Sequence, residues 1–228
     1  MQTNKKLGIL IVIQSLLIFV PMYILGTAIN WPDSLNYPAD RLLPLIYGQA
    51  SAVNIGYFVY FLYSILFFFT GTLLAWELKK TATNQARLHV AAIAAGLSSL
   101  ARVVGIIRWL VPFPILAAQY ATTVDPNLQM IQETVYTVVN NYGGAIGELL
   151  GVTIFASIWT ILISWEFIVQ KNLPTWLGYF GLLAALVSLS LFLEVFGLTV
   201  SGFLSQSLFH LWLLSVGMYF MVKKSPQT

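Results

Sequence analysis

Residues 101–109 read A-R-V-V-G-I-I-R-W, which places two arginines in a segment that is otherwise apolar enough to cross a membrane. An arginine at the centre of a span costs about 2.5–3.5 kcal/mol on insertion scales, so it usually faces the protein interior and has a partner. The segment therefore predicts a membrane-spanning helix whose arginines lie against other helices. The remaining apolar segments must supply those helices.

The whole chain has the composition of a membrane protein. Of its 228 residues, 58% are hydrophobic and 8% are charged, whereas about 25% are charged in an average soluble domain. Cysteine is absent, which excludes disulfides, thiolate metal sites, iron–sulfur clusters and cysteine nucleophiles. The net charge of +3 is attributed to membrane topology, so no nucleic-acid partner is expected.

Six apolar runs are long enough for the roughly 20 helical residues that a span needs. We predict spans at residues 7–29, 52–76, 90–111, 142–168, 176–196 and 203–222. They form an all-α polytopic membrane bundle, with one transmembrane domain over residues 1–228. Pro21 is expected to kink the first span, and a short interfacial helix is expected at residues 39–47. Asp125-Pro126 predicts a helix start, followed by a helix that lies on the membrane surface or runs into the fourth span.

Positive charge is divided unequally between the two sides of these spans. With both termini inside, the outer side carries only Arg41, and the inner side carries Lys5, Lys6, Lys79, Lys80, Arg87, Lys171, Lys223 and Lys224. Cytoplasmic loops retain lysine and arginine during insertion. We therefore predict a multi-pass protein of the cell membrane, the inner membrane where a cell has two, with cytoplasmic N and C termini and membrane lipid as a partner.

Two arginines belong to neither side. Arg102 shares a helix face with the small residues Ser98 and Ala95, which predicts that it lies inside the bundle. Arg108 lies near the outer boundary beside Trp109, so it is either a second interior charge or an arginine that extends to the membrane surface.

The fourth span offers a counter-charge. Gly143, Gly147 and Gly151 repeat every four residues, which is typical of close helix packing, and Glu148 lies among them at the predicted depth of Arg102. The first interpretation is an ion pair between Arg102 and Glu148. The alternative is a protonated, hydrogen-bonded carboxyl group, because burial favours the neutral acid.

The strongly polar groups within the spans all fall in the outer half of the membrane. The predicted ligand-binding residues are Asn54, Arg102, Arg108, Glu148, Glu194, Gln206 and His210. Glu194 is a second candidate partner of Arg108, and His210 is either a satisfied core residue or a titratable group. Their common depth predicts a polar cavity or network that faces outward.

Other chemistry has little support in the sequence. A G-x-S-x-G nucleophile motif and a glycine-rich phosphate loop are absent. His89 at the inner surface and His210 in the outer half are too far apart to share a metal. We assign no catalytic residue, metal or cofactor.

Four pieces of the chain resemble a bacterial family of multi-pass membrane proteins that is known as a domain of unknown function. They are G-I-I-R-W with P-F-P-I-L-A-A-Q-Y (residues 105–120), Y-G-G-A-I-G-E-L-L-G (142–151), Trp159, and L-P-T-W-L-G-Y-F-G-L-L-A (173–184). The resemblance implies an integral membrane fold, singles out Arg108, Trp109, Gly147 and Glu148, and implies no activity. Relatives often carry histidine at the place of Ile146 or Gly147, so a metal site is not expected here.

Three functions fit these observations. The first is the binding or transport of a small polar, anionic or amphipathic molecule in the outward-facing site. The second is a non-catalytic structural or regulatory subunit, with oligomer formation. The third is a membrane enzyme that acts on a lipid or isoprenoid head group, with Glu148 or His210 as general base. The sequence shows no inverted repeat, which would support transport. It also shows no recognisable nucleophile or metal motif, which would support an enzyme.

Overall fold

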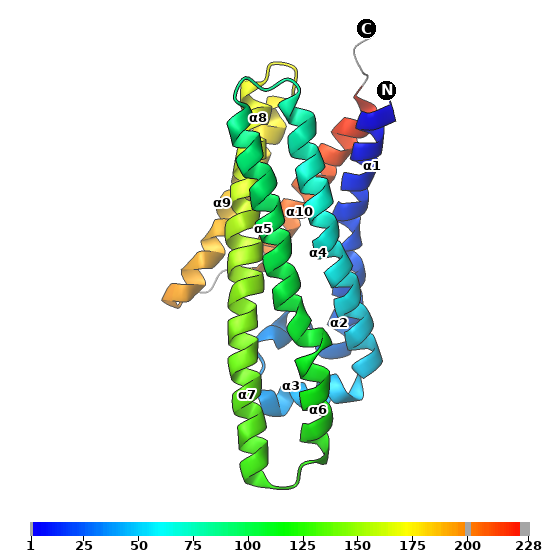
Figure 1. Ribbon diagram of the computed structural model, residues 1–228, viewed down its shortest axis with the longest axis vertical. Helices are drawn as coiled ribbons and strands as arrows, with labels where there is room; N and C mark the ends of the chain where they lie inside the picture. Colours follow the sequence, from blue (N-terminus) through cyan, green and yellow to red (C-terminus); the bar gives the residue numbers. More distant parts are fainter. Residues whose placement is uncertain (1, 199–201, 224–228) are drawn as a thin grey trace. The chain divides into compact units, whose positions relative to one another are not determined.

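The computed structural model describes residues 2–198 and 202–223, and this part of the chain is helical, without β-strands (Figure 1). Six of its helical segments are long and apolar enough to cross a membrane: Asn4–Ile29, Ala50–Lys79, Gln85–Thr122, Pro126–Val169, Thr175–Leu193 and Gly202–Val222. The predicted all-α membrane bundle with six spans is therefore confirmed.

The helices are numbered along the chain. They are α1 (Gln2–Leu17), α2 (Phe19–Ile29), η1 (Asp33–Asn36), α3 (Ala39–Gly48), α4 (Ala50–Lys79), α5 (Gln85–Leu110), α6 (Pro112–Thr122), α7 (Pro126–Gly144), η2 (Ala145–Phe155), α8 (Ala156–Val169), α9 (Thr175–Ser190), η3 (Leu191–Phe196) and α10 (Gly202–Val222). Of these, η1 and η3 are 3₁₀-helices and η2 is a π-helix.

Contacts divide the helices into two compact units. The first unit comprises Met1–Leu16, Ile65–Leu100 and Leu149–Thr228, and the second comprises Leu17–Ser64 and Ala101–Glu148. A single transmembrane domain over the whole chain stays a prediction. Each unit is described by itself.

The first span is interrupted where proline removes a hydrogen bond. Pro21 has no N–H to donate to the carbonyl of Leu17, four residues earlier, and its ring crowds that carbonyl. Accordingly α1 ends at Leu17 and α2 begins at Phe19. The helix is thus interrupted three residues before Pro21, at Ile18, and the kink itself stays a prediction.

In the second unit, α3 packs against α6, and α7 contacts both (Figure 1). The helix predicted at residues 39–47 is present as α3. The predicted spans at residues 90–111 and 142–168 left residues 112–122 outside any helix, and this was wrong. Pro112 stands in the first turn of α6, where its missing N–H costs nothing, and only Val111 interrupts the path from α5.

The helix start predicted at Asp125 is confirmed. The Asp125 carboxylate accepts a hydrogen bond from the backbone N–H of Asn127 at 2.9 Å, and Pro126 is the first helical residue. From there α7 continues through η2 into α8 without a break, as a helical segment of 44 residues. Of the two alternatives left open, the structure has the helix that runs into the fourth span.

In the first unit, α9 packs against α8 and α10. The side of α9 that is buried carries small residues, which are Gly178, Gly181, Ala184, Ala185 and Ser188. Two tryptophan indoles also join helices: Trp159 donates to the carbonyl of Gly71 at 3.2 Å, and Trp212 donates to that of Leu177 at 2.9 Å. The fifth span was predicted to continue to residue 196, but regular α-helix ends at Ser190 and the 3₁₀-helix η3 follows.

Candidate functional site

Arg108 is the centre of a polar cluster in the second unit. Its side chain is buried, and its guanidinium uses all three nitrogens. Nε donates to Asn140 Oδ1 at 3.2 Å, Nη1 donates to the Gly105 carbonyl at 2.9 Å, and Nη2 donates to Glu148 Oε1 at 2.8 Å. These bonds join α5, α7 and η2 at one point, and they show that Arg108 is an interior charge rather than a boundary anchor.

Glycines make room for this cluster. A Cβ atom added to Gly105 would lie 2.6 Å from the Cα of Gly147 and 2.9 Å from the carbonyl oxygen of Gly143. A Cβ atom on Gly143 would lie 2.7 Å from Cδ of Arg108. Because the first two obstacles are backbone atoms, no rotamer change can relieve them. The close helix packing predicted from the glycine repeat is thus present at Gly143 and Gly147.

Glu148 lies in the π-helix η2, a backbone form that often occurs at functional sites. Its side chain is 52% exposed, whereas that of Arg108 is 6% exposed. Oε2 accepts no hydrogen bond from any residue that the structure describes. The carboxylate is therefore held from one side and accessible from the other.

The sequence favoured Arg102 as the partner of Glu148, whereas the structure gives this ion pair to Arg108. The difference arises because depth was counted from helix ends predicted at residues 111 and 142, where the helical path in fact continues as α6 and α7. The contact between Gly105 and Gly147 sets the actual register, and it brings Arg108, one turn after Gly105, to Glu148.

Asn140 and Tyr136 are site residues that the sequence analysis missed. Asn140 Nδ2 donates to the carbonyl of Leu35 at 3.0 Å, and the Tyr136 hydroxyl donates to the carbonyl of Tyr37 at 3.1 Å. They attach the segment between α2 and α3 to α7. A signal was present, because Tyr136, Asn140, Gly144 and Glu148 recur at intervals of four and so approach one helix face.

Tyr57 of α4 contributes an aromatic wall in the same unit. Its ring stacks on Trp109, with centroids 4.3 Å apart and planes at 13°. The side chain is 1% exposed, and its hydroxyl has no hydrogen-bond partner within the described residues. The Arg108 guanidinium carbon lies 5.6 Å from the Trp109 ring centroid.

Two further candidates belong to the second unit. Arg102 is buried, as predicted, and its guanidinium carbon lies 6.0 Å from the ring centroid of Tyr63. Asn54, one of the predicted ligand-binding residues, is exposed. Val53 and Tyr57, four residues apart, define the buried face of α4, and Asn54 is turned about 100° away from Val53.

Gln206 and His210 lie in the first unit, whereas Arg108 and Glu148 lie in the second. His210 is buried, and its Nδ1 is 2.7 Å from the Gln206 carbonyl oxygen, one helical turn earlier. Glu194 is within η3, but its side chain lies outside the described part of the structure. The structure thus brings Arg108 and Glu148 together, and the single layer of seven residues stays a prediction.

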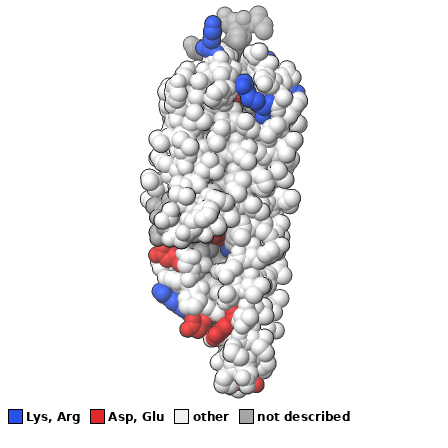
Figure 2. All heavy atoms as spheres, turned by 90° about the vertical axis from the view of Figure 1, so that its left-hand side faces the viewer, with Lys and Arg blue, Asp and Glu red and all other residues white. Residues whose placement is uncertain are grey.

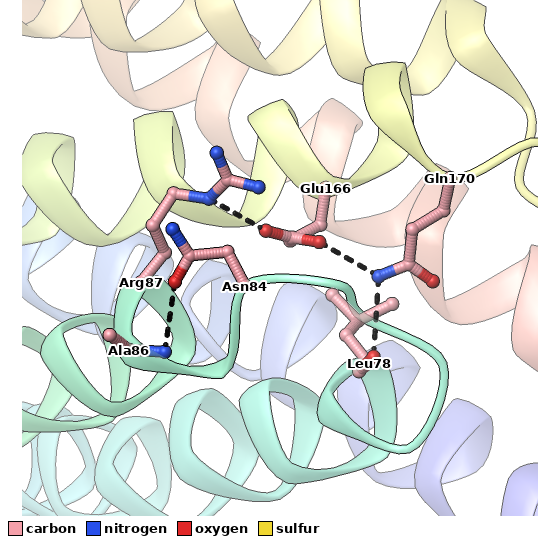
Figure 3. A network of polar contacts seen from close by, with 6 residues as sticks. All are labelled: Leu78, Asn84, Ala86, Arg87, Glu166 and Gln170. Atoms are coloured by element: carbon pink, nitrogen blue, oxygen red, sulfur yellow. Dashed lines mark hydrogen bonds and ion pairs between the residues drawn. The ribbon is translucent and has the colours of Figure 1, made fainter.

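A second polar cluster, which the sequence analysis also missed, lies in the first unit (Figure 3). Glu166 of α8 is fully buried, and its Oε1 accepts from Arg87 Nε at 3.0 Å. Its Oε2 accepts from Gln170 Nε2 at 2.8 Å, and the same nitrogen is 3.3 Å from the Leu78 carbonyl. Arg87 had been treated as a loop charge and Glu166 as the end of a span. The signal was an acid within the apolar run of α8.

The rest of the surface offers few charged groups. On the face shown in Figure 2, Lys, Arg, Asp and Glu side chains form small clusters, and a broad area between them is uncharged. Within the described residues, no three His, Cys, Asp or Glu side chains lie together as metal ligands would.

Comparison with known proteins places the chain in one family. The chain has no significant match among curated proteins or among solved structures. A family model described as a domain of unknown function, DUF4386, matches residues 7–217. This range includes both polar clusters, four of the six apolar helices in full, and most of the first and the last. The chain, with its six helices long and apolar enough to cross a membrane, therefore belongs to the DUF4386 family, whose function is unknown.

Proposed function

We propose that the second unit binds the polar head of an amphipathic molecule through Glu148. The observation that carries this proposal is the asymmetric ion pair, in which a buried arginine holds a half-exposed carboxylate. A carboxylate on a membrane-spanning helix is costly without a polar neighbour. Oε2 of Glu148 is positioned to receive a hydrogen bond from such a neighbour.

The contacts of Arg108 favour a hydrogen-bond donor over an anion as the ligand head. Each guanidinium nitrogen already donates to a protein oxygen, so an anion would have to compete with Glu148 for the same group. A hydroxyl or ammonium head instead complements the carboxylate directly, through a charge-assisted hydrogen bond.

The surroundings favour a ligand with an apolar body. Within the second unit, Ile107 and Val111, close to Arg108 in the sequence, and Tyr142, close to Glu148, are all exposed. Such side chains suit contact with hydrocarbon, which is also what surrounds a membrane-spanning helix. A long-chain alcohol or amine could therefore reach Glu148 from the lipid phase.

Thermal unfolding of the purified protein tests this proposal. A ligand that binds only the folded state raises the melting temperature, and the stabilisation grows with the logarithm of one plus the ratio of free ligand concentration to Kd. We expect a long-chain alkylamine, and more weakly an alkanol, to raise the melting temperature of the wild type, whereas a fatty acid of equal length does not.

Two variants distinguish binding at Glu148 from a general effect of the amphiphiles on protein stability. Glu148→Gln keeps an oxygen that can accept the Arg108 bond but removes the charge, and it should abolish the amine effect. Glu133→Gln is the matched control, because Glu133 accepts a hydrogen bond from the Tyr120 hydroxyl away from this cluster. A stronger effect of the fatty acid, or an unchanged amine effect in Glu148→Gln, would contradict the proposal.

A second candidate function follows from the same contacts. Because Arg108 links three helical elements, the cluster also suits a structural subunit in which another chain supplies the donor to Glu148. In that case Glu148→Gln should lower the oligomeric mass measured by light scattering, and none of the three amphiphiles should shift the melting temperature.

A further inference from the structure

The turn between α4 and α5 places basic side chains against the end of α8 in the first unit. Gln170 fixes this arrangement, because it donates to the Leu78 carbonyl and accepts from the Thr81 hydroxyl at 2.6 Å. Lys79 follows Leu78, and Lys171 follows Gln170. The basic residues near this turn are Lys79, Lys80, Arg87 and Lys171, and the acids are Glu77 and Glu166. Four cations and two carboxylates leave a net charge of +2.

Arg87 has donors that the protein does not use. Only its Nε bonds to Glu166, and in Figure 3 no dashed line reaches either terminal nitrogen of the guanidinium. Neither has a hydrogen-bond partner among the described residues. The Arg87 side chain is 31% exposed, so a molecule outside the protein can reach this edge.

Glu166 holds the guanidinium in place without occupying that edge. The carboxylate is fully buried, and its second oxygen is already taken by Gln170. A guanidinium bound through Nε keeps four N–H groups on its terminal nitrogens, in the planar fork that matches a phosphate. The fold already orders the Arg87 side chain. Ligand binding therefore loses little side-chain conformational entropy, which favours affinity.

The neighbouring lysine is also short of a counter-charge. Lys79 Nζ lies 2.7 Å from Nε2 of His89 and makes no ion pair with a carboxylate of the described residues. Lys80, by contrast, pairs with Glu77. The group that would complete this site is therefore an oxyanion.

We propose that Arg87 binds a phosphate group at this end of the first unit, either the head group of an anionic phospholipid or free phosphate. Juxtamembrane basic residues attract anionic lipid in general. The fork of Arg87 adds a directional contact to that attraction. This site is separate from Glu148, and its test does not depend on the function proposed for the second unit.

The experiment measures binding to the purified full-length protein in a neutral detergent, by the rise in melting temperature. Three probes are used: phosphatidylglycerol, diacylglycerol as a lipid without phosphate, and inorganic phosphate. We expect phosphatidylglycerol to stabilise the wild type and diacylglycerol to have no effect. Stabilisation by inorganic phosphate as well would assign the site to free phosphate, and its absence would assign the site to lipid.

Variants test whether phosphate binding depends on the guanidinium fork of Arg87 or only on its positive charge. Arg87→Lys keeps the charge and can still pair with Glu166, but its single ammonium leaves no second group, so we expect binding about tenfold weaker. Lys80→Gln removes one exposed charge and should weaken binding by less than about threefold. Should Arg87→Lys fail to fold, the neutral double variant Arg87→Gln with Glu166→Gln carries the same expectation.

Three outcomes would overturn the proposal. They are equal binding by wild type and Arg87→Lys, a loss in Lys80→Gln as large as that in Arg87→Lys, and no stabilisation by either phosphate probe. The first two would mean that diffuse charge, not the guanidinium fork, attracts the lipid.

Discussion

At the scale of single residues, Arg108 and Glu148 form an ion pair whose two side chains differ in solvent exposure. Arg108 is buried and cannot be hydrated, whereas half of the Glu148 side chain is accessible. We expect Arg108→Gln and Glu148→Gln each to lower the free energy of unfolding by about 2–4 kcal/mol, since each leaves a charge uncompensated. The double variant should cost less than the sum of the two. Chemical unfolding in mixed micelles, followed by circular dichroism, measures all three; strict additivity would mean that the pair contributes nothing.

Glu166 supports a second prediction at this scale. Both of its oxygens accept hydrogen bonds and neither is exposed. In Glu166→Gln the new amide must direct an N–H at either Arg87 or Gln170, which are both donors, so we expect a loss of about 2–3 kcal/mol. Glu77→Gln is the control, because its partner Lys80 is 60% exposed and such pairs contribute about 1 kcal/mol or less. Equal losses in the two variants would refute this reasoning.

Sequence reasoning at this scale identified the charges better than their partners. Arg102, Arg108 and Glu148 stand out because charge is rare in an apolar run, and the burial of Arg102 followed from its small neighbours. The pairing of Arg108 with Glu148 depends on helix register, which the approach of Gly105 to Gly147 sets. Asn140 was missed because an uncharged amide does not stand out by its charge, and only its four-residue spacing from Tyr136 and Gly144 indicates it.

At the scale of elements, the contact between α5 and η2 depends on two glycines. A methyl group on Gly105 would meet backbone atoms at 2.6 Å and 2.9 Å, so the helices would have to separate. We expect Gly105→Ala to lower the free energy of unfolding by at least about 2 kcal/mol. On the same helix, Gly96 has only Phe68 ring atoms nearby, the nearest at 3.6 Å. Gly96→Ala should be neutral or stabilising by up to about 1 kcal/mol, and the same unfolding assay compares the two variants.

The number of membrane-crossing elements was predictable, but their lengths were not. Six apolar runs suffice to count spans, because a lipid-embedded backbone must satisfy its hydrogen bonds within a helix. The prolines at 112 and 114 were taken as the end of a helix, although proline is tolerated in a first turn. The helix that begins after Asp125 was predicted, but the polar residues between 126 and 141 left open whether it joins the fourth span.

At the scale of the whole molecule, the distribution of lysine and arginine predicts that both termini are cytoplasmic. The absence of cysteine makes this easy to test with single-cysteine variants. Val124, which is 94% exposed, lies in the short loop between α6 and α7, and Asn84 lies in the turn between α4 and α5. In intact cells, a membrane-impermeant maleimide should label Val124→Cys, and Asn84→Cys only after lysis. The reverse pattern would invert the topology.

The helical segment Pro126–Val169 is much longer than a membrane is thick. Its 44 residues extend about 65 Å at 1.5 Å per residue, against about 40–45 Å for a bilayer with its head groups. Part of this helical segment must therefore lie outside the hydrocarbon, and a membrane-impermeant maleimide should label a single-cysteine variant at its polar start, Asn127→Cys.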